Sequence, residues 1–390
     1  MSHKGLEKAV KIVFVSNYFN HHQSPLSEAL DIQTDHNYSF LAAEKMAPER
    51  RKLGWEDQVL PAFVCNANDP RSLMHIQEAD VLIVGSFPEQ PLRSYIRKGK
   101  LLFRYAERPL KHGIELPKYL PRLLKWHWRN PPGKPIYMLC ASAFTAGDYR
   151  KFGLFRDRCY KWGYFPETRL YPDLGKLFAN KSTLTIVWCG RFLDWKHPDD
   201  ALEVARHLKA DGMRFALKLI GTGPLEDALR QRVQADELQD CVELLGAMSP
   251  EKVRDAMEQA GIFLFTSDRK EGWGAVLNEA MNSGCAVAAS DAVGSVPYLV
   301  KDGKNGLVYH SGDVNELYEK VKWLLEHPEQ QRLLGEAAYR TIADLWNAEV
   351  AAKRFMQLSQ AILDGDPSPS LFEEGPCSRA EIIREDWYQG

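Results

Sequence analysis

Residues 261–284 read GIFLFTSDRKEGWGAVLNEAMNSG: an apolar run, a polar loop, two glycines around Trp273 and then a helical pattern. Glu271 ends the loop, and Glu279 lies eight residues later on the predicted helix. The start of such a helix offers backbone N–H groups and a positive end to an anion, with a carboxylate on either side to hold hydroxyl groups. A phosphorylated sugar has both features, so the segment predicts a site for such a ligand.

The same order of strand and helix repeats through the second half of the chain. Short apolar runs that alternate with amphipathic helices are typical of a parallel sheet covered on both faces. We therefore predict a doubly wound, Rossmann-like α/β domain. Its strands are expected at 184–190, 215–221, 242–246, 262–267, 285–290 and 306–310, and its helices at 198–209, 224–236, 249–259, 274–282 and 313–326.

The first half has a similar but less regular pattern, which predicts a second domain of the same kind. Strands are expected at 11–17, 38–43, 58–63, 80–86, 100–107 and 136–142, with a helix at 24–31. A ligand cleft between two such domains would face the carboxyl ends of both sheets. The expected organisation is an N-terminal acceptor-side domain over 1–165, a linker over 166–182, a C-terminal nucleotide-sugar domain over 183–340, and helices over 341–390 that pack back on the N-terminal domain and end in a tail.

Composition limits the class of protein. The 390 residues are 45% hydrophobic and 26% charged, which is typical of a globular protein. No apolar run approaches the roughly 20 residues that span a bilayer, and the polar start does not resemble a signal peptide. We expect a cytoplasmic protein, with the inner face of the membrane as an alternative location. The seven cysteines have none of the spacings of a zinc site, and neither a metal nor a cofactor is expected.

Basic residues and glycines follow the earlier strands of the C-terminal domain. Gly190 and Arg191 end one strand, and Lys196 follows five residues later. Arg and Lys neutralise a diphosphate, and the strand end is where phosphates would lie; as an isolated pair they would be ordinary surface charges. Gly221 and Gly223 permit a close approach of ligand to backbone, or simply a positive φ. No GxGxxG fingerprint is completed, which disfavours a nicotinamide or flavin enzyme.

Five segments together resemble a known family. GRFLDWK, LIGTGP, VELLG, EGWGAVLNE and SVPYLVKDGKNGLVY occur in the order and spacing of the retaining glycosyltransferases of family 4, which have the two-domain GT-B fold. The resemblance covers about residues 184–345 and is weak before them. It implies transfer of a sugar from a nucleotide diphosphate sugar to an acceptor hydroxyl. The segments are residues 190–196, 219–224, 242–246, 271–279 and 295–309.

The resemblance also implies roles for individual residues on the donor side. Arg191 and Lys196 would hold the donor diphosphate, Glu271 would lie near the donor sugar, and Glu279 would hold the ribose hydroxyls. Backbone N–H groups and the surroundings of the nucleobase would come from Gly272, Trp273, Gly274, Leu245 and Gly246. Arginine, lysine and a helix start can stabilise a departing diphosphate without a metal ion. We therefore interpret Asp199 and Asp200 as residues that cap a helix start and complement its dipole.

The acceptor side departs from the family pattern. Members commonly have a Gly-Gly loop after the first strand and a histidine after the fourth or fifth. Here His21 and His22 follow the first strand, and Glu107 ends the strand expected at 100–107. Glu107 is a candidate for the usual histidine's role, or it is a surface glutamate. The two histidines are candidates for acceptor contacts, or for capping and core roles.

The segment 116–135 interleaves Leu, Tyr and Trp with five basic residues. This pattern fits an anionic membrane surface, but equally a surface helix whose basic side chains extend to water. A nucleic-acid partner is disfavoured because it would leave the paired carboxylates without a role. We predict a retaining, metal-independent hexosyltransferase with a glycan or lipid-linked acceptor. The alternatives are an epimerase or phosphorylase of the same fold and a non-catalytic scaffold.

Overall fold

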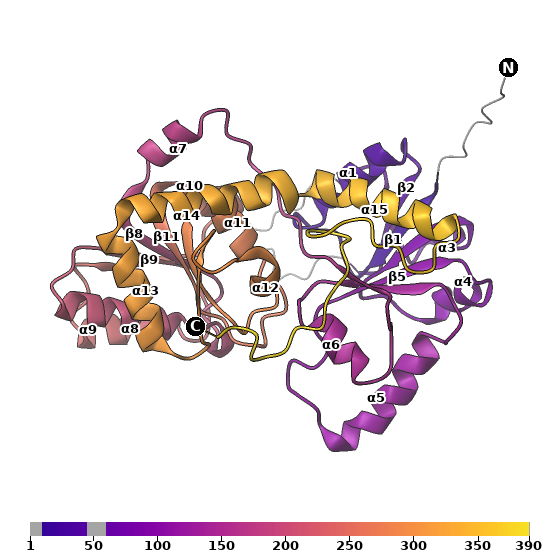
Figure 1. Cartoon of the computed structure of the whole chain (residues 1–390), viewed down its shortest axis with the longest axis horizontal. Coiled ribbons are helices and arrows are strands. Elements are labelled where there is room, and N and C mark those ends of the chain that lie inside the picture. Colours follow the sequence, from indigo (N-terminus) through magenta and orange to yellow (C-terminus); the bar gives the residue numbers. More distant parts are fainter. Residues whose placement is uncertain (1–9, 45–59, 390) are drawn as a thin grey trace.

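Two parallel β-sheets organise the computed structural model, which describes residues 10–44 and 60–389 (Figure 1). The first sheet has seven strands in the order β3-β2-β1-β4-β5-β6-β7, and the second has six in the order β10-β9-β8-β11-β12-β13. In each sheet the chain adds strands first on one side of the domain's first strand and then on the other, as in doubly wound folds. The predicted fold class, two Rossmann-like α/β domains, is confirmed.

The strands of the first sheet are short and mostly buried on both faces. They are β1 Ile12–Ser16, β2 Tyr38–Ala42, β3 Val64–Asn66, β4 Val81–Val84, β5 Leu101–Ala106, β6 Ile136–Cys140 and β7 Cys159–Lys161. The helices between them are α1 Ser24–Gln33, α3 Ser72–Glu78, η1 Gln90–Leu92, α4 Arg93–Arg97, α5 Leu116–Arg129 and α6 Thr145–Arg150.

The second sheet begins after α7 Leu174–Ala179. Its strands are β8 Ser182–Cys189, β9 Ala216–Ile220, β10 Val242–Gly246, β11 Ala260–Phe265, β12 Ala286–Ser290 and β13 Leu307–Tyr309. Its helices are η2 Asp194–Lys196, α8 Pro198–Ala210, α9 Glu226–Ala235, α10 Pro250–Gln259, α11 Val276–Asn282, α12 Val296–Leu299, α13 Val314–Glu326 and α14 Pro328–Arg340, and the π-helical turn η3 Thr341–Leu345 leads into α15 Ala348–Leu363.

Alternate residues of each strand enter different cores, because successive side chains point to opposite faces of a sheet. On β1, Phe14 belongs to the core shared with α15, while Val13 and Val15 belong to the core on the other face. Both faces are therefore covered by helices, which explains why these strands are apolar throughout.

The core on one face of each sheet continues from domain to domain. Helix α15 crosses to the first domain, where it lies against α1 and β5 (Figure 1). There Phe355 packs on Phe103, with ring centroids 4.9 Å apart. Trp346, just before α15, packs on Trp273 of the second domain with centroids 5.9 Å apart. The two sheets thus share one continuous apolar layer that holds the domains together.

Some predicted elements differ from the observed ones. The strand expected at 58–63 is wrong at residues 60–63, since the observed strand is Val64–Asn66; residues 58 and 59 lie outside the described residues. Strand β7 was not predicted, because three residues carry too little periodicity.

Candidate active site

Loops after neighbouring strands of the second sheet form one wall of the candidate site. The Gly221 amide donates to the Gly246 carbonyl at 2.8 Å. Gly221 has a φ of 141°, and a Cβ there would lie 1.9 Å from the Gly190 carbonyl oxygen. A Cβ on Gly223 would lie 2.5 Å from the Phe192 carbonyl oxygen. These glycines are therefore required by loop-on-loop packing, whatever ligand the wall holds.

Lys196 and Glu271 meet across this wall. The Lys196 ammonium forms an ion pair with Glu271 Oε2, and the Ser267 hydroxyl donates to the same oxygen at 3.3 Å. The two ion-paired side chains are 14% and 17% exposed. Thr266 Oγ1 donates to the Lys196 carbonyl at 2.6 Å, which fixes the loop after β11 against η2. The cation and carboxylate are thus preorganised beside each other, as a charge-stabilising site requires.

Arg191 lies at the end of β8 and is exposed. Within the described part of the chain its guanidinium has neither a hydrogen bond nor an ion pair, so its donors are available to an anion. Leu245 and Gly246, which were predicted beside a nucleobase, are half-buried at the end of β10. Since β10, β9 and β8 are neighbours in the sheet, their carboxyl ends lie at one edge with Arg191.

Glu279 lies in the first turn of α11, while Glu271 lies in the preceding loop, as predicted. Burial raises the pKa of the Glu279 carboxyl to about 7, and the positive charges of Arg254 and Arg169 oppose this shift. Burial, and secondarily the charge of Glu279, also raises the pKa of the Cys189 thiol, which places the carboxyl near the end of β8. Glu279 as a residue is half-buried, and its carboxyl has no ion pair within the described part of the chain, so it is suited to accept hydrogen bonds from hydroxyl groups.

Glu107 reaches the Gly272 backbone from the other domain. A Cβ on Gly272 would lie 1.9 Å from Glu107 Oε2. The same carboxylate accepts hydrogen bonds from the Tyr164 hydroxyl at 2.7 Å and from the Lys111 ammonium at 2.5 Å. Burial, followed by the charge of Glu107, raises the pKa of the Tyr164 phenol well above its usual value, so it remains a donor. Glu107 is therefore brought to the Glu271 loop.

The Trp273 side chain packs in the interior. It is fully buried, and its Nε1 donates to Asn278 Oδ1 at 2.9 Å. A Cβ on Gly163 would lie 2.3 Å from the indole, and one on Gly274 would lie 2.3 Å from the Phe265 ring. The Trp273 side chain thus anchors the loop in the interdomain core, so only the Trp273 backbone can face a ligand.

Sequence reasoning missed several residues of this region. Tyr164 and Lys111 support Glu107, as described above. A Cβ on Gly294 would lie 2.0 Å from the Gly272 carbonyl oxygen, and the Ala143 amide of the first domain donates to the Gly294 carbonyl at 2.8 Å. Gly294 stands directly before the sequence SVP, where a glycine has no distinctive signal, and no periodic pattern surrounds Tyr164. These contacts can therefore be found only in the three-dimensional structure.

His21 and His22 follow β1 and lead into α1. Their rings are 3.9 Å apart between centroids, and the His22 amide donates to Asn20 Oδ1 at 2.9 Å. These contacts belong to the first domain.

A cavity of about 480 Å³ lies at the carboxyl end of β4 and β5, and Ala106 in its wall directly precedes Glu107. A buried ion-pair network lines it. Arg104 donates to both carboxylate oxygens of Glu89 at 3.0 Å, and to Asn130 Oδ1 at 2.9 Å. Arg129 approaches Glu89 at 2.9 Å. The cavity combines charged groups with Trp126, Tyr105 and Tyr149, a combination that suits a polar ligand with apolar faces.

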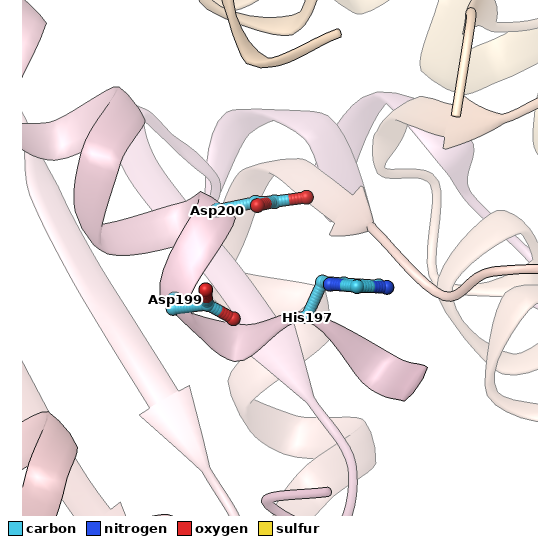
Figure 2. Close-up of side chains that lie close together, drawn as sticks. All are labelled: His197, Asp199 and Asp200. Carbon is cyan, nitrogen blue, oxygen red and sulfur yellow. The ribbon is translucent and has the colours of Figure 1, made fainter. Parts of the chain in front are cut away.

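His197, Asp199 and Asp200 lie close together at the start of α8 (Figure 2). One ligand atom from each lies within 4.8 Å of the others. The predicted complementation of the helix dipole is confirmed, since both aspartates lie in the first helical turn. The predicted capping is wrong, because His197 is the N-cap residue. Burial raises the pKa of the Asp200 carboxyl to about 6.

Comparison with solved structures defines the class of fold. The chain is similar to the Anabaena protein Alr3699/HepE in complex with UDP, with a TM-score of 0.67 and 16% identity over 90% of this chain and 100% of that chain. It is also similar to WaaG, a glycosyltransferase involved in lipopolysaccharide biosynthesis, with a TM-score of 0.60 and 14% identity over 91% of this chain and 100% of that chain. The fold is GT-B.

Sequence comparison then identifies the second domain. Residues 173–341 match the family Glycosyl transferases group 1. The putative colanic acid biosynthesis glycosyltransferase WcaL of Escherichia coli K12 is 28% identical over 234 residues, which are 58% of this chain and 56% of that protein.

The amylovoran biosynthesis glycosyltransferase AmsK of Erwinia amylovora is 32% identical over 139 residues, which are 34% of each protein. The matches cover 56% of this WcaL protein and 45% of the protein of the same name from Salmonella typhimurium. The chain therefore spans about half the length of the curated relatives it matches.

Proposed function

We propose that this protein is a retaining, metal-independent glycosyltransferase of family 4 that transfers a sugar from a nucleotide diphosphate sugar to an acceptor hydroxyl in polysaccharide or glycolipid assembly. The observation that carries the proposal is the group of charges at the strand ends of the group 1 domain. Arg191, which is exposed and has no partner among residues 10–44 and 60–389, lies at the same edge of the sheet as the preorganised pair of Lys196 and Glu271. UDP is bound by the similar Anabaena protein, and a nucleoside diphosphate has the charge that this group complements.

The proposed reaction breaks the bond between the anomeric carbon and the diphosphate oxygen. Negative charge then develops on the leaving diphosphate, and the Arg191 guanidinium and Lys196 ammonium stabilise it. Glu271 already holds Lys196, so the ammonium is oriented before the donor arrives. In the proposed complex Glu271 lies beside the donor sugar and stabilises its positive charge. The acceptor hydroxyl attacks the anomeric carbon from the face that the diphosphate leaves, and its proton passes to the released diphosphate oxygen as the new glycosidic bond forms.

Glu279 and Glu107 have separate proposed roles. The buried Glu279 carboxyl accepts hydrogen bonds from the ribose hydroxyls, which would replace the water it loses on burial. Glu107, which borders both Gly272 and the wall of the 480 Å³ cavity, contacts the acceptor. We place the acceptor sugar in that cavity because aromatic rings and ion-paired polar groups both line it.

The test of this proposal is a screen of UDP-, GDP- and ADP-sugars for donor hydrolysis and transfer, with and without EDTA. We expect one nucleotide class to be hydrolysed at a rate that EDTA leaves unchanged, and NMR of the product to show the anomeric configuration of the donor. An inverted product or loss of turnover in EDTA contradicts the mechanism. Epimerised nucleotide sugar, or phosphorolysis, would instead identify another enzyme of the same fold.

We further propose that α5 places the protein on an anionic membrane, where a lipid-linked acceptor lies. Its inner face packs on the first domain, with Trp126 and Phe152 centroids 4.5 Å apart. Its outer face presents Leu120, Leu124 and Trp128, which are 60%, 64% and 52% exposed and recur every four residues. Lys118 and Lys125 flank this row and are also exposed. None of the helices within residues 10–44 and 60–389 is long and apolar enough to cross a bilayer.

This surface is tested by sedimentation with vesicles of phosphatidylglycerol or phosphatidylcholine. We expect binding to the anionic vesicles only, and its loss when Leu120, Leu124 and Trp128 are all replaced by serine. The control is Leu333→Ser on α14, a leucine that is 56% exposed. Equal binding by the triple variant and the control contradicts the membrane role. Donor hydrolysis is unchanged in either case, because α5 lies outside the donor site.

A further inference from the structure

The C-terminal segment after α15 returns to the second domain, so the chain crosses between domains once more (Figure 1). It first joins the edge of the first sheet: the Cys377 amide donates to the Lys161 carbonyl, and the Lys161 amide donates to the Ser378 carbonyl, both at 2.8 Å. It then reaches the second domain, where Trp387 Nε1 donates to the Asp291 carbonyl at 2.9 Å. The segment is anchored at both ends.

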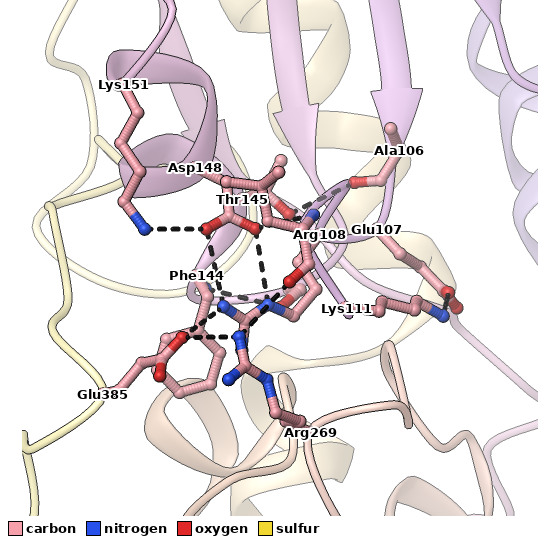
Figure 3. A network of polar contacts seen from close by, with 12 residues as sticks. Ala106, Glu107, Arg108, Lys111, Phe144, Thr145, Asp148, Lys151, Arg269 and Glu385 are labelled. Atoms are coloured by element: carbon pink, nitrogen blue, oxygen red, sulfur yellow. Dashed lines mark hydrogen bonds and ion pairs between the residues drawn. The ribbon is translucent and has the colours of Figure 1, made fainter. Parts of the chain in front are cut away.

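Between these anchors, Glu385 joins two arginines from different domains (Figure 3). Its Oε1 lies 2.8 Å from Arg108 Nη2 and 3.0 Å from Arg269 Nη2. Arg269 Nη2 also donates to the Leu110 carbonyl of the first domain at 3.3 Å. One carboxylate from the tail thus holds the loop after β11 against the first domain.

The Arg108 end of this bridge is firmly held. Its side chain is 2% exposed, and its Nε and Nη2 donate to the two carboxylate oxygens of Asp148, each at 3.4 Å. Its guanidinium also lies 4.7 Å from the centre of the Phe144 ring. The Arg269 end is 40% exposed and belongs to the loop that carries Glu271 two residues later. The bridge therefore joins a rigid anchor to a loop of the donor site.

Without Glu385, Arg269 would lose its carboxylate partner, while Arg108 would keep Asp148. The hydrogen bond of Arg269 to the Leu110 carbonyl would remain. The contribution of Glu385 is electrostatic, and salt screens it at exposed positions. The loop that carries Glu271 would then be held less firmly against the first domain.

We propose that Glu385 is a positioning residue: the C-terminal segment fixes the Glu271 loop across the cleft by placing one carboxylate between Arg108 and Arg269. The segment thereby acts as a latch: it holds the donor-site loop in place and at the same time holds this loop against the first domain. The effect on turnover rests on the proposed function, whereas the effect on the loop does not.

The test compares Glu385→Ala with Glu381→Ala. Glu381 lies on the same segment, is 70% exposed and forms an ion pair with Lys161 at 3.5 Å, so its replacement is a matched loss of charge away from the two arginines. Hydrogen exchange of amides 268–274 is measured in the full chain without ligand. We expect exchange about three- to tenfold faster in Glu385→Ala than in Glu381→Ala, and a smaller difference at 0.5 M than at 0.05 M salt. Equal exchange in the two variants would overturn the proposal.

A second variant, Arg269→Gln, removes the loop end of the bridge but leaves the tail and Arg108 intact. It should accelerate exchange by a similar factor, and the double variant should be no faster than either single one. Additive effects contradict the bridge. With a donor substrate in hand, Glu385→Ala should lower kcat about three- to tenfold while Kd for the nucleoside diphosphate changes less than twofold, a split that general destabilisation does not produce. If the wild-type chain turns over no nucleotide sugar, the exchange result still tests whether Glu385 holds the Glu271 loop.

Discussion

Replacement of Glu279 by glutamine should stabilise the protein, and more so at higher pH. Burial raises the pKa of this carboxyl to about 7 from an ordinary value of 4.5. Burial disfavours the ionised carboxyl, so ionisation of Glu279 lowers the free energy of unfolding. This penalty is absent well below pH 4.5, where the carboxyl is protonated in both the folded and the unfolded chain. The penalty grows between pH 4.5 and 7 as the unfolded chain ionises first, and it is constant above pH 7. At 1.36 kcal/mol for each pKa unit, it amounts to about 1 kcal/mol at pH 5 and about 3 kcal/mol at pH 8.

The measurement is urea unfolding of wild type and Glu279→Gln at pH 5 and pH 8. We expect the free energy of unfolding of the variant to gain about 2 kcal/mol relative to wild type between these pH values. The control, Glu319→Gln, removes one carboxylate from an exposed position of α13 and should show no such difference. A difference that is the same at both pH values, or a destabilised variant at pH 8, refutes the reasoning that burial dominates the Glu279 environment.

Three further results are expected. Arg191→Ala should weaken binding of the nucleoside diphosphate by about 1.5–3 kcal/mol in calorimetry, because a charged hydrogen-bonding partner is lost; unchanged affinity would remove Arg191 from the site. Gly272→Ala should lower the free energy of unfolding by about 1–3 kcal/mol, since the new Cβ displaces Glu107, and by less in a Glu107→Ala background. Nucleotide binding at pH 7 should release protons in wild type but not in Glu279→Gln, because ribose hydroxyls favour the ionised carboxylate; equal release by both proteins places the ribose elsewhere.

The second domain could be predicted from its sequence because each of its strands and helices has a clear period. Glu271 in a loop and Glu279 in the first helical turn followed from two glycines and the apolar spacing alone. The first domain was harder, as the three-residue strands β3 and β7 show: such short segments owe their pairing to neighbouring strands and carry little pattern of their own.

Contacts between distant segments could not be predicted. Gly272 and Trp273 were expected to present backbone N–H groups to a ligand, but the sequence did not indicate that the Glu107 carboxylate lies against Gly272. Nor did it indicate that the Trp273 side chain is buried against Gly163. Likewise, the region over 341–390 was expected to end in a tail, and only the fold reveals that Glu385 in this region contacts one arginine from each domain. Such contacts depend on how the two domains pack.

The central claim is that Glu271, beside Lys196, serves transfer of a sugar from a nucleotide diphosphate donor. The most direct test measures donor turnover and nucleoside diphosphate affinity of wild type and Glu271→Ala with the nucleotide sugar that the screen identifies. The account predicts that wild type turns over the donor, while Glu271→Ala loses turnover and still binds the nucleoside diphosphate through Arg191 and Lys196. Undiminished turnover by Glu271→Ala, or a wild-type chain that binds no nucleoside diphosphate, would contradict it.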